Sequence, residues 1–132
     1  MKYVLDTNTL IYFFRGQGEV AKHLWQHSPQ DIGIPAIVLF ELNVGIAKST
    51  APEKRRQQLK SLIDVITILP FGKAEADHGA KIRAELEQKG TPIGPYDILI
   101  AATAVTNRAV LVTHNIDEFS RIPQLQIEDW FI

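Results

Sequence analysis

Short apolar segments alternate along the whole chain with longer segments of helical periodicity. The apolar segments have the length of buried strands, and each is followed by residues that commonly begin a helix. They predict strands at Lys2–Leu5, Asp31–Ile34, Asp64–Leu69 and Ala109–Thr113, with Leu125–Ile127 as a last edge strand. Because strands and helices alternate, we expect an α/β fold with a parallel sheet.

The segments between these strands predict helices, since apolar residues recur there at helical spacing. Proline or glycine stands where several of them would begin or end, and Gly90 is placed to stop the longest. The predicted helices are Thr9–Phe14, Glu19–Gln26, Ala36–Lys48, Pro52–Ile63, Lys73–Gln88, Asp97–Thr106 and a turn at Asp117–Ser120. No repeat or linker divides the chain, so we expect residues 1–132 to form a single domain.

Composition narrows the class of protein. The chain has 132 residues, of which 45% are hydrophobic and 22% charged, as in an ordinary globular domain. No apolar run reaches the ~18 residues of a membrane span, and the N-terminus lacks signal-peptide features, so we expect a cytoplasmic protein without membrane contact. The absence of cysteine excludes disulfides and thiol catalysis. The net charge of −1 gives no general indication of nucleic-acid binding.

Acidic residues stand where the predicted strands end. Asp6 closes the first strand, Glu41 lies in the helix after the second, and Asp97 begins an apolar helix. In parallel α/β sheets, ligands bind at the edge where the strands end, so we expect these carboxylates to converge. Clustered carboxylates repel one another unless they share a proton or a cation. Oxygen ligands favour Mg²⁺ or Mn²⁺, and such a site suits phosphoryl chemistry.

Each acid also has a structural explanation. Asp6 can cap the following helix, and Asp97 can complement the dipole of its own helix. Glu41 can pair with a buried arginine, and Asp117 can cap a surface turn. From the residues alone both interpretations stay open.

Four segments together carry a resemblance to a known family. "YVLDTNTLIYF", "ELNVGIAKS", "IGPYDILIAATA" and "LVTHNIDEFSRIPQLQIEDW" resemble, in this order, the PIN domains of VapC-type toxins. The resemblance implies a parallel sheet of about five strands with helices on both sides. It also implies a Mg²⁺- or Mn²⁺-dependent endoribonuclease, the toxin of a type II toxin–antitoxin module, which cleaves a structured RNA such as initiator tRNA and inhibits translation.

The resemblance also assigns roles to individual residues. Metal binding and catalysis are expected of Asp6, Glu41 and Asp97. Asn8 is expected to orient Asp6, and Thr113 to bring a hydroxyl near the site. Many PIN domains have aspartate where this chain has Asn115. We therefore expect Asn115 to contact ligand or substrate and Asp117 to be the fourth catalytic acid.

The family further implies a VapB-type antitoxin that covers the site, and a homodimer or a larger toxin–antitoxin assembly. Candidate contacts with the antitoxin are apolar residues near the early helices: Ile11, Tyr12, Phe13, Phe14, Leu39 and Phe40. Candidate RNA-binding residues are Arg15, Lys48 and Arg55. The latter two lie in the basic segment 48–60, for which a solvated helix face is the favoured interpretation.

Other patterns lead to weaker hypotheses. His23 and His27 have zinc-like spacing but lack the glutamate of a metalloprotease motif, so we expect ordinary packing beside Trp25. "DTNTL" also resembles the start of haloacid-dehalogenase phosphatases, with Asp6 as nucleophile, although Asn8 replaces their acid/base aspartate. A receiver domain is also an α/β fold with clustered acids. It requires paired acids after the first strand and a lysine after a late strand, and "LDTN" and "LVTHN" supply neither. A catalytically inactive RNA-binding module on the same fold is the remaining alternative.

Overall fold

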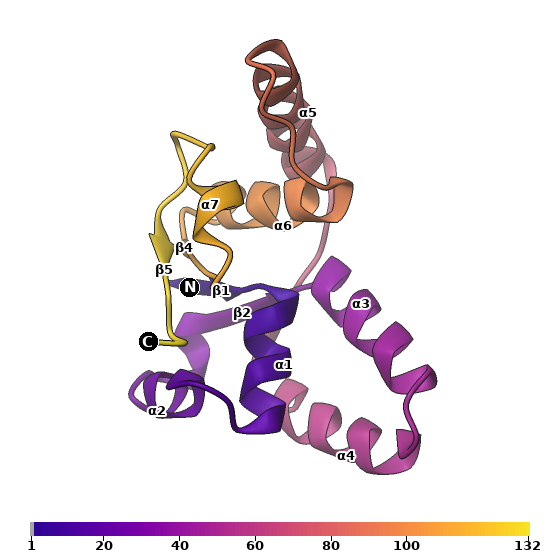
Figure 1. Ribbon diagram of the computed structural model, residues 1–132. Coiled ribbons are helices and arrows are strands. Elements are labelled where there is room, and N and C mark those ends of the chain that lie inside the picture. Colours follow the sequence, from indigo (N-terminus) through magenta and orange to yellow (C-terminus); the bar gives the residue numbers. More distant parts are fainter. Residues whose placement is uncertain (1) are drawn as a thin grey trace.

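The computed structural model describes residues 2–132 and is built around a five-stranded sheet (Figure 1). The strand order is β3-β2-β1-β4-β5, and every neighbouring pair runs parallel. The strands are β1 (Tyr3–Leu5), β2 (Ile32–Pro35), β3 (Thr67–Leu69), β4 (Val110–Val112) and β5 (Ile127–Glu128). The predicted α/β fold with a parallel five-stranded sheet is therefore confirmed.

The direction in which the chain moves across the sheet sets the side on which each helix lies. From β1 the chain moves outward to β2 and β3, then crosses back to β4 and β5. Because such crossovers are right-handed, the early helices cover one face and the late helices the other, as Figure 1 shows. The early helices are α1 (Thr7–Arg15), α2 (Val20–Trp25), α3 (Ala36–Ala47) and α4 (Pro52–Ile63). The late helices are α5 (Lys73–Gln88), α6 (Pro95–Thr106) and α7 (Ile116–Phe119).

Local sequence explains where the main helices begin and end. Asp6 caps α1, because its side chain accepts a hydrogen bond from the backbone of Thr9. Gly90 adopts a φ of 71° just after α5, as expected of the residue predicted to stop that helix. The middle of helix α6, residues 100–104, is buried, and Ala102 lies where Gly79 of α5 allows close approach.

The structure differs from the predicted elements in a few places. α1 begins two residues earlier than predicted because Asp6 is its cap, and a short 3-10 helix, Pro29–Asp31, was not predicted. His23 and His27 both stack on Trp130, a buried residue near the C-terminus, whereas Trp25 is 70% exposed. The two histidines therefore pack as expected, on a tryptophan other than Trp25. Among residues 2–132, every helix is too short or too polar to cross a membrane.

Candidate active site

The site lies where the order of the strands reverses. β1 has β2 on one side and β4 on the other, and the connections that leave β1 and β4 go to opposite faces of the sheet. Open α/β sheets bind ligands at such a switch point, beyond the carboxyl ends of the strands. Asp6 directly follows β1 and Thr113 directly follows β4. These two residues therefore lie side by side at the edge of the sheet where the acids are expected.

Asp6 is buried and held at both oxygens. It is only 4% exposed; Oδ1 accepts the backbone N–H of Thr9 at 2.9 Å, and Oδ2 accepts the hydroxyl of Thr113 at 2.5 Å. The Thr113 oxygen in turn accepts the backbone N–H of Asn115 at 3.0 Å, which directs the hydroxyl hydrogen toward Asp6. The pKa of Asp6 is raised overall, mainly because burial disfavours the charged form. Hydrogen bonds from Thr113 and Thr9 lower the pKa in part, and the nearby charge of Glu41 adds to the increase. Asp6 thus serves as a helix cap and as a fixed carboxylate of the site.

Glu41 extends from α3 and is half-buried. Its Oε1 accepts a hydrogen bond of 2.7 Å from the hydroxyl of Thr7, in the first turn of α1. The alternative in which Glu41 pairs with a buried arginine is wrong, since no salt bridge within residues 2–132 includes it. Glu41 therefore joins α1 and α3 through the neutral hydroxyl of Thr7.

Asp97 sits in the first turn of α6 and has the clearest electrostatic signature. The pKa of Asp97 is raised to about 6, first of all by burial of the carboxyl. The charge of Glu118 and a hydrogen bond with its carboxyl raise the pKa further, and the charges of Asp6 and Glu41 add to the same effect. The charges of Asp6, Glu41 and Glu118 thus all act on Asp97, and these four residues form the acidic set of the site. They come from four segments far apart in the sequence, which the carboxyl edge of the sheet brings together.

The structure bears on two of the predicted roles. The acid beside Asp97 is Glu118, whereas Asp117, the residue predicted for this place, is exposed. The two are neighbours on the single-turn helix α7, so their side chains point in directions about 100° apart. Asn8 is also exposed, and the orientation of Asp6 comes instead from the Thr9 backbone and from Thr113, whose predicted place near the site is observed.

The donor set fits a hard divalent cation. All four side chains offer carboxylate oxygens, and no lysine, arginine or histidine within residues 2–132 forms an ion pair with any of them. As the side chains lie, no three acidic or histidine residues of that range are close enough to hold one ion. A cation bound among these carboxylates would offset their mutual repulsion.

Comparison with known proteins identifies the family. The sequence profile of the PIN domain matches residues 3–125, nearly the whole chain. The chain belongs to the PIN-domain family. It is 40% identical over 130 residues to the tRNA(fMet)-specific endonuclease VapC of Salmonella typhimurium and 37% identical over 138 residues to ribonuclease VapC2 of Rickettsia felis, with 98% of each chain covered in both cases. The toxin-like resemblance of the four segments is thereby confirmed.

Solved structures place the fold in the same group. A DNA-bound VapBC structure from Salmonella typhimurium superposes with a TM-score of 0.92 at 40% identity, covering 98% of each chain. A FitAcB structure from Neisseria gonorrhoeae superposes with a TM-score of 0.86 at 26% identity and 97% coverage. The phosphatase and receiver-domain alternatives are not favoured, because these matches extend over the whole fold of a PIN domain.

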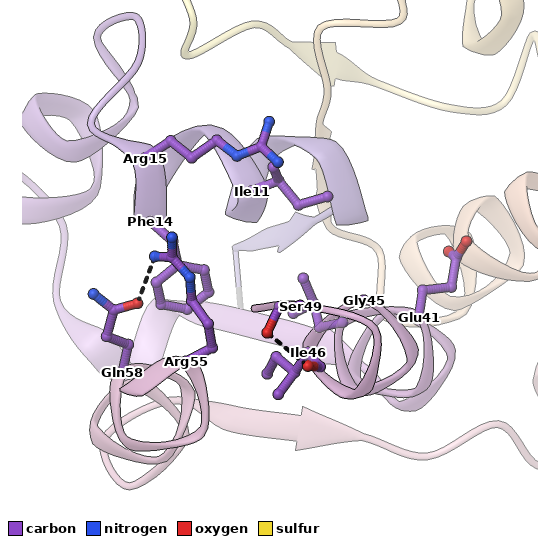
Figure 2. Close-up of a pocket in the computed structure, with 10 residues that line it drawn as sticks. Ile11, Phe14, Arg15, Glu41, Gly45, Ile46, Ser49, Arg55 and Gln58 are labelled. Carbon is purple, nitrogen blue, oxygen red and sulfur yellow. Dashed lines mark hydrogen bonds between the residues drawn. The ribbon is translucent and has the colours of Figure 1, made fainter. Parts of the chain in front are cut away.

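A groove of about 220 Å³ leads away from the acids of this PIN domain, between α1, α3 and α4. Its floor is apolar and includes Ile11 and Phe14, two of the residues predicted to contact an antitoxin. Figure 2 shows Arg15 and Arg55 projecting from different helices along the groove, with Glu41 at its far end. The groove thus combines apolar surface, two guanidinium groups and one acid of the site.

The other predicted contacts lie elsewhere. Tyr12 packs on Phe131, and Phe13 packs on Phe14 and on the exposed Trp25, so neither Tyr12 nor Phe13 lines the groove. Leu39 is only partly buried and packs against the core. Phe40 is 51% exposed and meets the ring edge of Tyr96, which is 46% exposed.

Lys48 and Asn115 remain at the margins of the site. Lys48 is exposed and caps the end of α3, outside the set of residues that line the groove. Asn115 caps α7 and touches the site through its backbone N–H on Thr113. His114, beside it, forms a 2.8 Å contact with Asp129 and stacks on Phe131.

Proposed function

We propose that this PIN domain is a divalent-metal-dependent endoribonuclease, the toxin of a type II toxin–antitoxin module. The observation that carries the proposal is a set of four carboxylates at the switch point that form no ion pair within residues 2–132, with the pKa of Asp97 raised to about 6. Relatives named tRNA(fMet)-specific endonuclease VapC support tRNA, and initiator tRNA first, as the substrate. Cleavage of such an RNA would inhibit translation.

Asp6, Glu41 and Asp97 are the residues that would hold Mg²⁺ or Mn²⁺, with Glu118 beside them. A divalent ion bound there supplies a Lewis acid for the phosphate and lowers the pKa of a water molecule. Hydrogen bonds from the hydroxyls of Thr7 and Thr113 and from the Thr9 backbone fix the side chains of Glu41 and Asp6, which would hold the ion. Since the pKa of Asp97 is about 6, this ligand is mostly ionised at neutral pH and becomes protonated in mild acid. Activity should therefore decline below about pH 6 and recover with added metal.

The groove offers a surface for the partner that such a toxin requires. We expect a VapB-type antitoxin to lay an amphipathic segment over Ile11 and Phe14, close enough to the acids to block them. The similar solved structures of VapBC support this partner.

When the antitoxin is absent, Arg15 and Arg55, with Lys48 nearby, are proposed to contact RNA phosphates. The exposed pair of Phe40 and Tyr96 is a candidate surface for the expected homodimer or larger assembly.

The test is cleavage of total tRNA by the purified, antitoxin-free protein in Mg²⁺, Mn²⁺ or EDTA. We expect a discrete cut that requires metal and is lost in Asp6→Asn and Asp97→Asn. Asp77→Asn is the matched control, because Asp77 is an exposed aspartate of α5 paired with Lys73, remote from the site. A cut that persists in EDTA or in both site variants would refute the proposal. Binding of tRNA without any cut would favour the inactive RNA-binding module.

A further inference from the structure

The side chain of Glu41 has one hydrogen bond within residues 2–132, and Thr7 supplies it. The Thr7 hydroxyl donates to Oε1 at 2.7 Å, and the two residues are 34 positions apart. Thr7 occupies the first turn of α1, and Glu41 lies midway along α3. The contact therefore ties two helices together at the acidic end of the groove.

The position of Thr7 at the start of its helix explains why the hydroxyl is available. A threonine inside a helix commonly turns its hydroxyl back to the carbonyl four residues earlier. For Thr7 that residue is Tyr3, which lies in β1, so no helical carbonyl competes for the hydroxyl. The hydroxyl is free to donate outward, and Glu41 is its acceptor.

Glu41 needs such a contact more than Asp6 does. Asp6 has a short side chain, is almost fully buried and accepts two hydrogen bonds. Glu41 has a longer, more flexible side chain and is half-buried. Its negative charge contributes to the raised pKa values of both Asp6 and Asp97, so it lies within electrostatic reach of these two acids. Repulsion from these charges favours rotation of Glu41 toward solvent, away from its neighbours. The hydrogen bond from Thr7 opposes that rotation.

We propose that Thr7 is a positioning residue, whose hydroxyl holds Oε1 of Glu41 so that Oε2 remains available to a divalent cation. Thr7 itself touches neither the cation nor the RNA in this proposal. The inference rests on the proposed function in so far as it takes Glu41 to be a metal ligand. It adds a residue that lies outside the acidic set and acts through one member of it.

Metal binding tests this role without relying on RNA cleavage. We would measure Mn²⁺ binding to the wild-type protein, Thr7→Val and Thr7→Ser by isothermal titration calorimetry. Loss of a group that orients a metal ligand commonly weakens binding by about 10- to 100-fold, so Thr7→Val should bind Mn²⁺ at least about tenfold more weakly. Thr7→Ser keeps the hydroxyl and should stay within about twofold of wild type.

Thr106→Val is the matched control for loss of a threonine hydroxyl. Thr106 is also part-buried and hydrogen-bonds a side chain of another helix, Nδ1 of His78 at 2.9 Å, but lies at the far end of α6 from Asp97. It should bind Mn²⁺ as wild type does, and thermal unfolding in EDTA would confirm that all variants are folded. If Thr7→Val is unstable, Thr7→Ala makes the same test with a smaller side chain.

Two results would overturn the role of Thr7. One is wild-type Mn²⁺ affinity in Thr7→Val, and the other is an equal loss of affinity in Thr7→Ser or Thr106→Val. Cleavage of tRNA, measured in parallel, distinguishes failure of this inference from failure of the proposed function. Absence of cleavage by a wild-type protein that binds Mn²⁺ would contradict the nuclease proposal only. Wild-type affinity in a Thr7→Val protein, with cleavage by wild type intact, would contradict only the role of Thr7.

Discussion

Replacing Asp97 by asparagine should stabilise the metal-free protein at neutral pH while abolishing its activity. The pKa of Asp97 rises from 3.8 to about 6 on folding. A difference of about two pH units at roughly 1.36 kcal/mol each sets a ceiling of about 3 kcal/mol on the cost of ionising Asp97 in the folded protein. Because the side chain is only half-buried, solvent screening reduces this cost, and we expect a gain of about 1–3 kcal/mol.

The sign and the pH window follow from the same shift. Below pH 3.8 the carboxyl is protonated in both the folded and the unfolded chain, so it does not disfavour folding. As the pH rises from about 4 to about 6, the unfolded chain releases its proton first, and the wild type loses stability. Asparagine carries no charge at any pH. The stability difference between Asp97→Asn and wild type should therefore be small at pH 4, about a fifth of its full value, and should reach that full value above pH 7.

Urea unfolding in EDTA at pH 4, 5.5 and 7.5 would measure this difference, with Asp77→Asn as the control. Asp77 is exposed and paired only with Lys73, so its replacement should change the free energy of unfolding by less than about 0.5 kcal/mol. Equal or lower stability of Asp97→Asn at pH 7.5 would refute the electrostatic description of the site. So would a stability difference that does not change with pH.

Three further substitutions test other parts of the site and fold. Glu118→Gln should reduce RNA cleavage at least about tenfold, and Asp117→Asn less than about twofold; the reverse order in a rate assay would restore Asp117 as the fourth acid. Thr113→Val should lower the free energy of unfolding by about 1–3 kcal/mol in urea titration, because it leaves a buried carboxylate oxygen without its donor. Gly18→Ala should cost about 1–3 kcal/mol, since Gly18 has a φ of +62° and a new Cβ would lie 2.7 Å from the Phe131 carbonyl oxygen; an unchanged melting temperature would contradict this.

The places of Asp6, Glu41 and Asp97 in the fold could be derived from the sequence. Asp6 and Asp97 stand beside apolar segments, one ending a strand and one beginning a buried helix, and topology alone brings such positions to one edge. Glu41 follows from the same reasoning, because its helix begins directly after β2. The functional and structural interpretations of Asp6 also proved compatible, since one carboxylate caps a helix and faces the site.

Contacts that depend on side-chain direction or helix crossing were not predictable in the same way. The sequence "NIDEF" offers two adjacent acids, and only the orientation of α7 distinguishes Glu118 from Asp117. The bond from Thr7 to Glu41 depends on how α1 and α3 approach each other, which no local pattern encodes. Trp130 was likewise not recognised as the partner of the two histidines, because the C-terminal segment meets α2 only in the folded chain.

The chemistry of the cut ends tests the proposed mechanism most directly. Initiator tRNA would be cleaved by the wild-type protein in Mn²⁺, and the new ends would be mapped by enzymatic labelling and mass spectrometry. If a water molecule is the nucleophile at a carboxylate-held metal site, the products carry a 5′-phosphate and a 3′-hydroxyl. Products with a 2′,3′-cyclic phosphate would show that the RNA's own 2′-hydroxyl attacked, and would contradict a metal-dependent hydrolytic role for Asp6, Glu41 and Asp97.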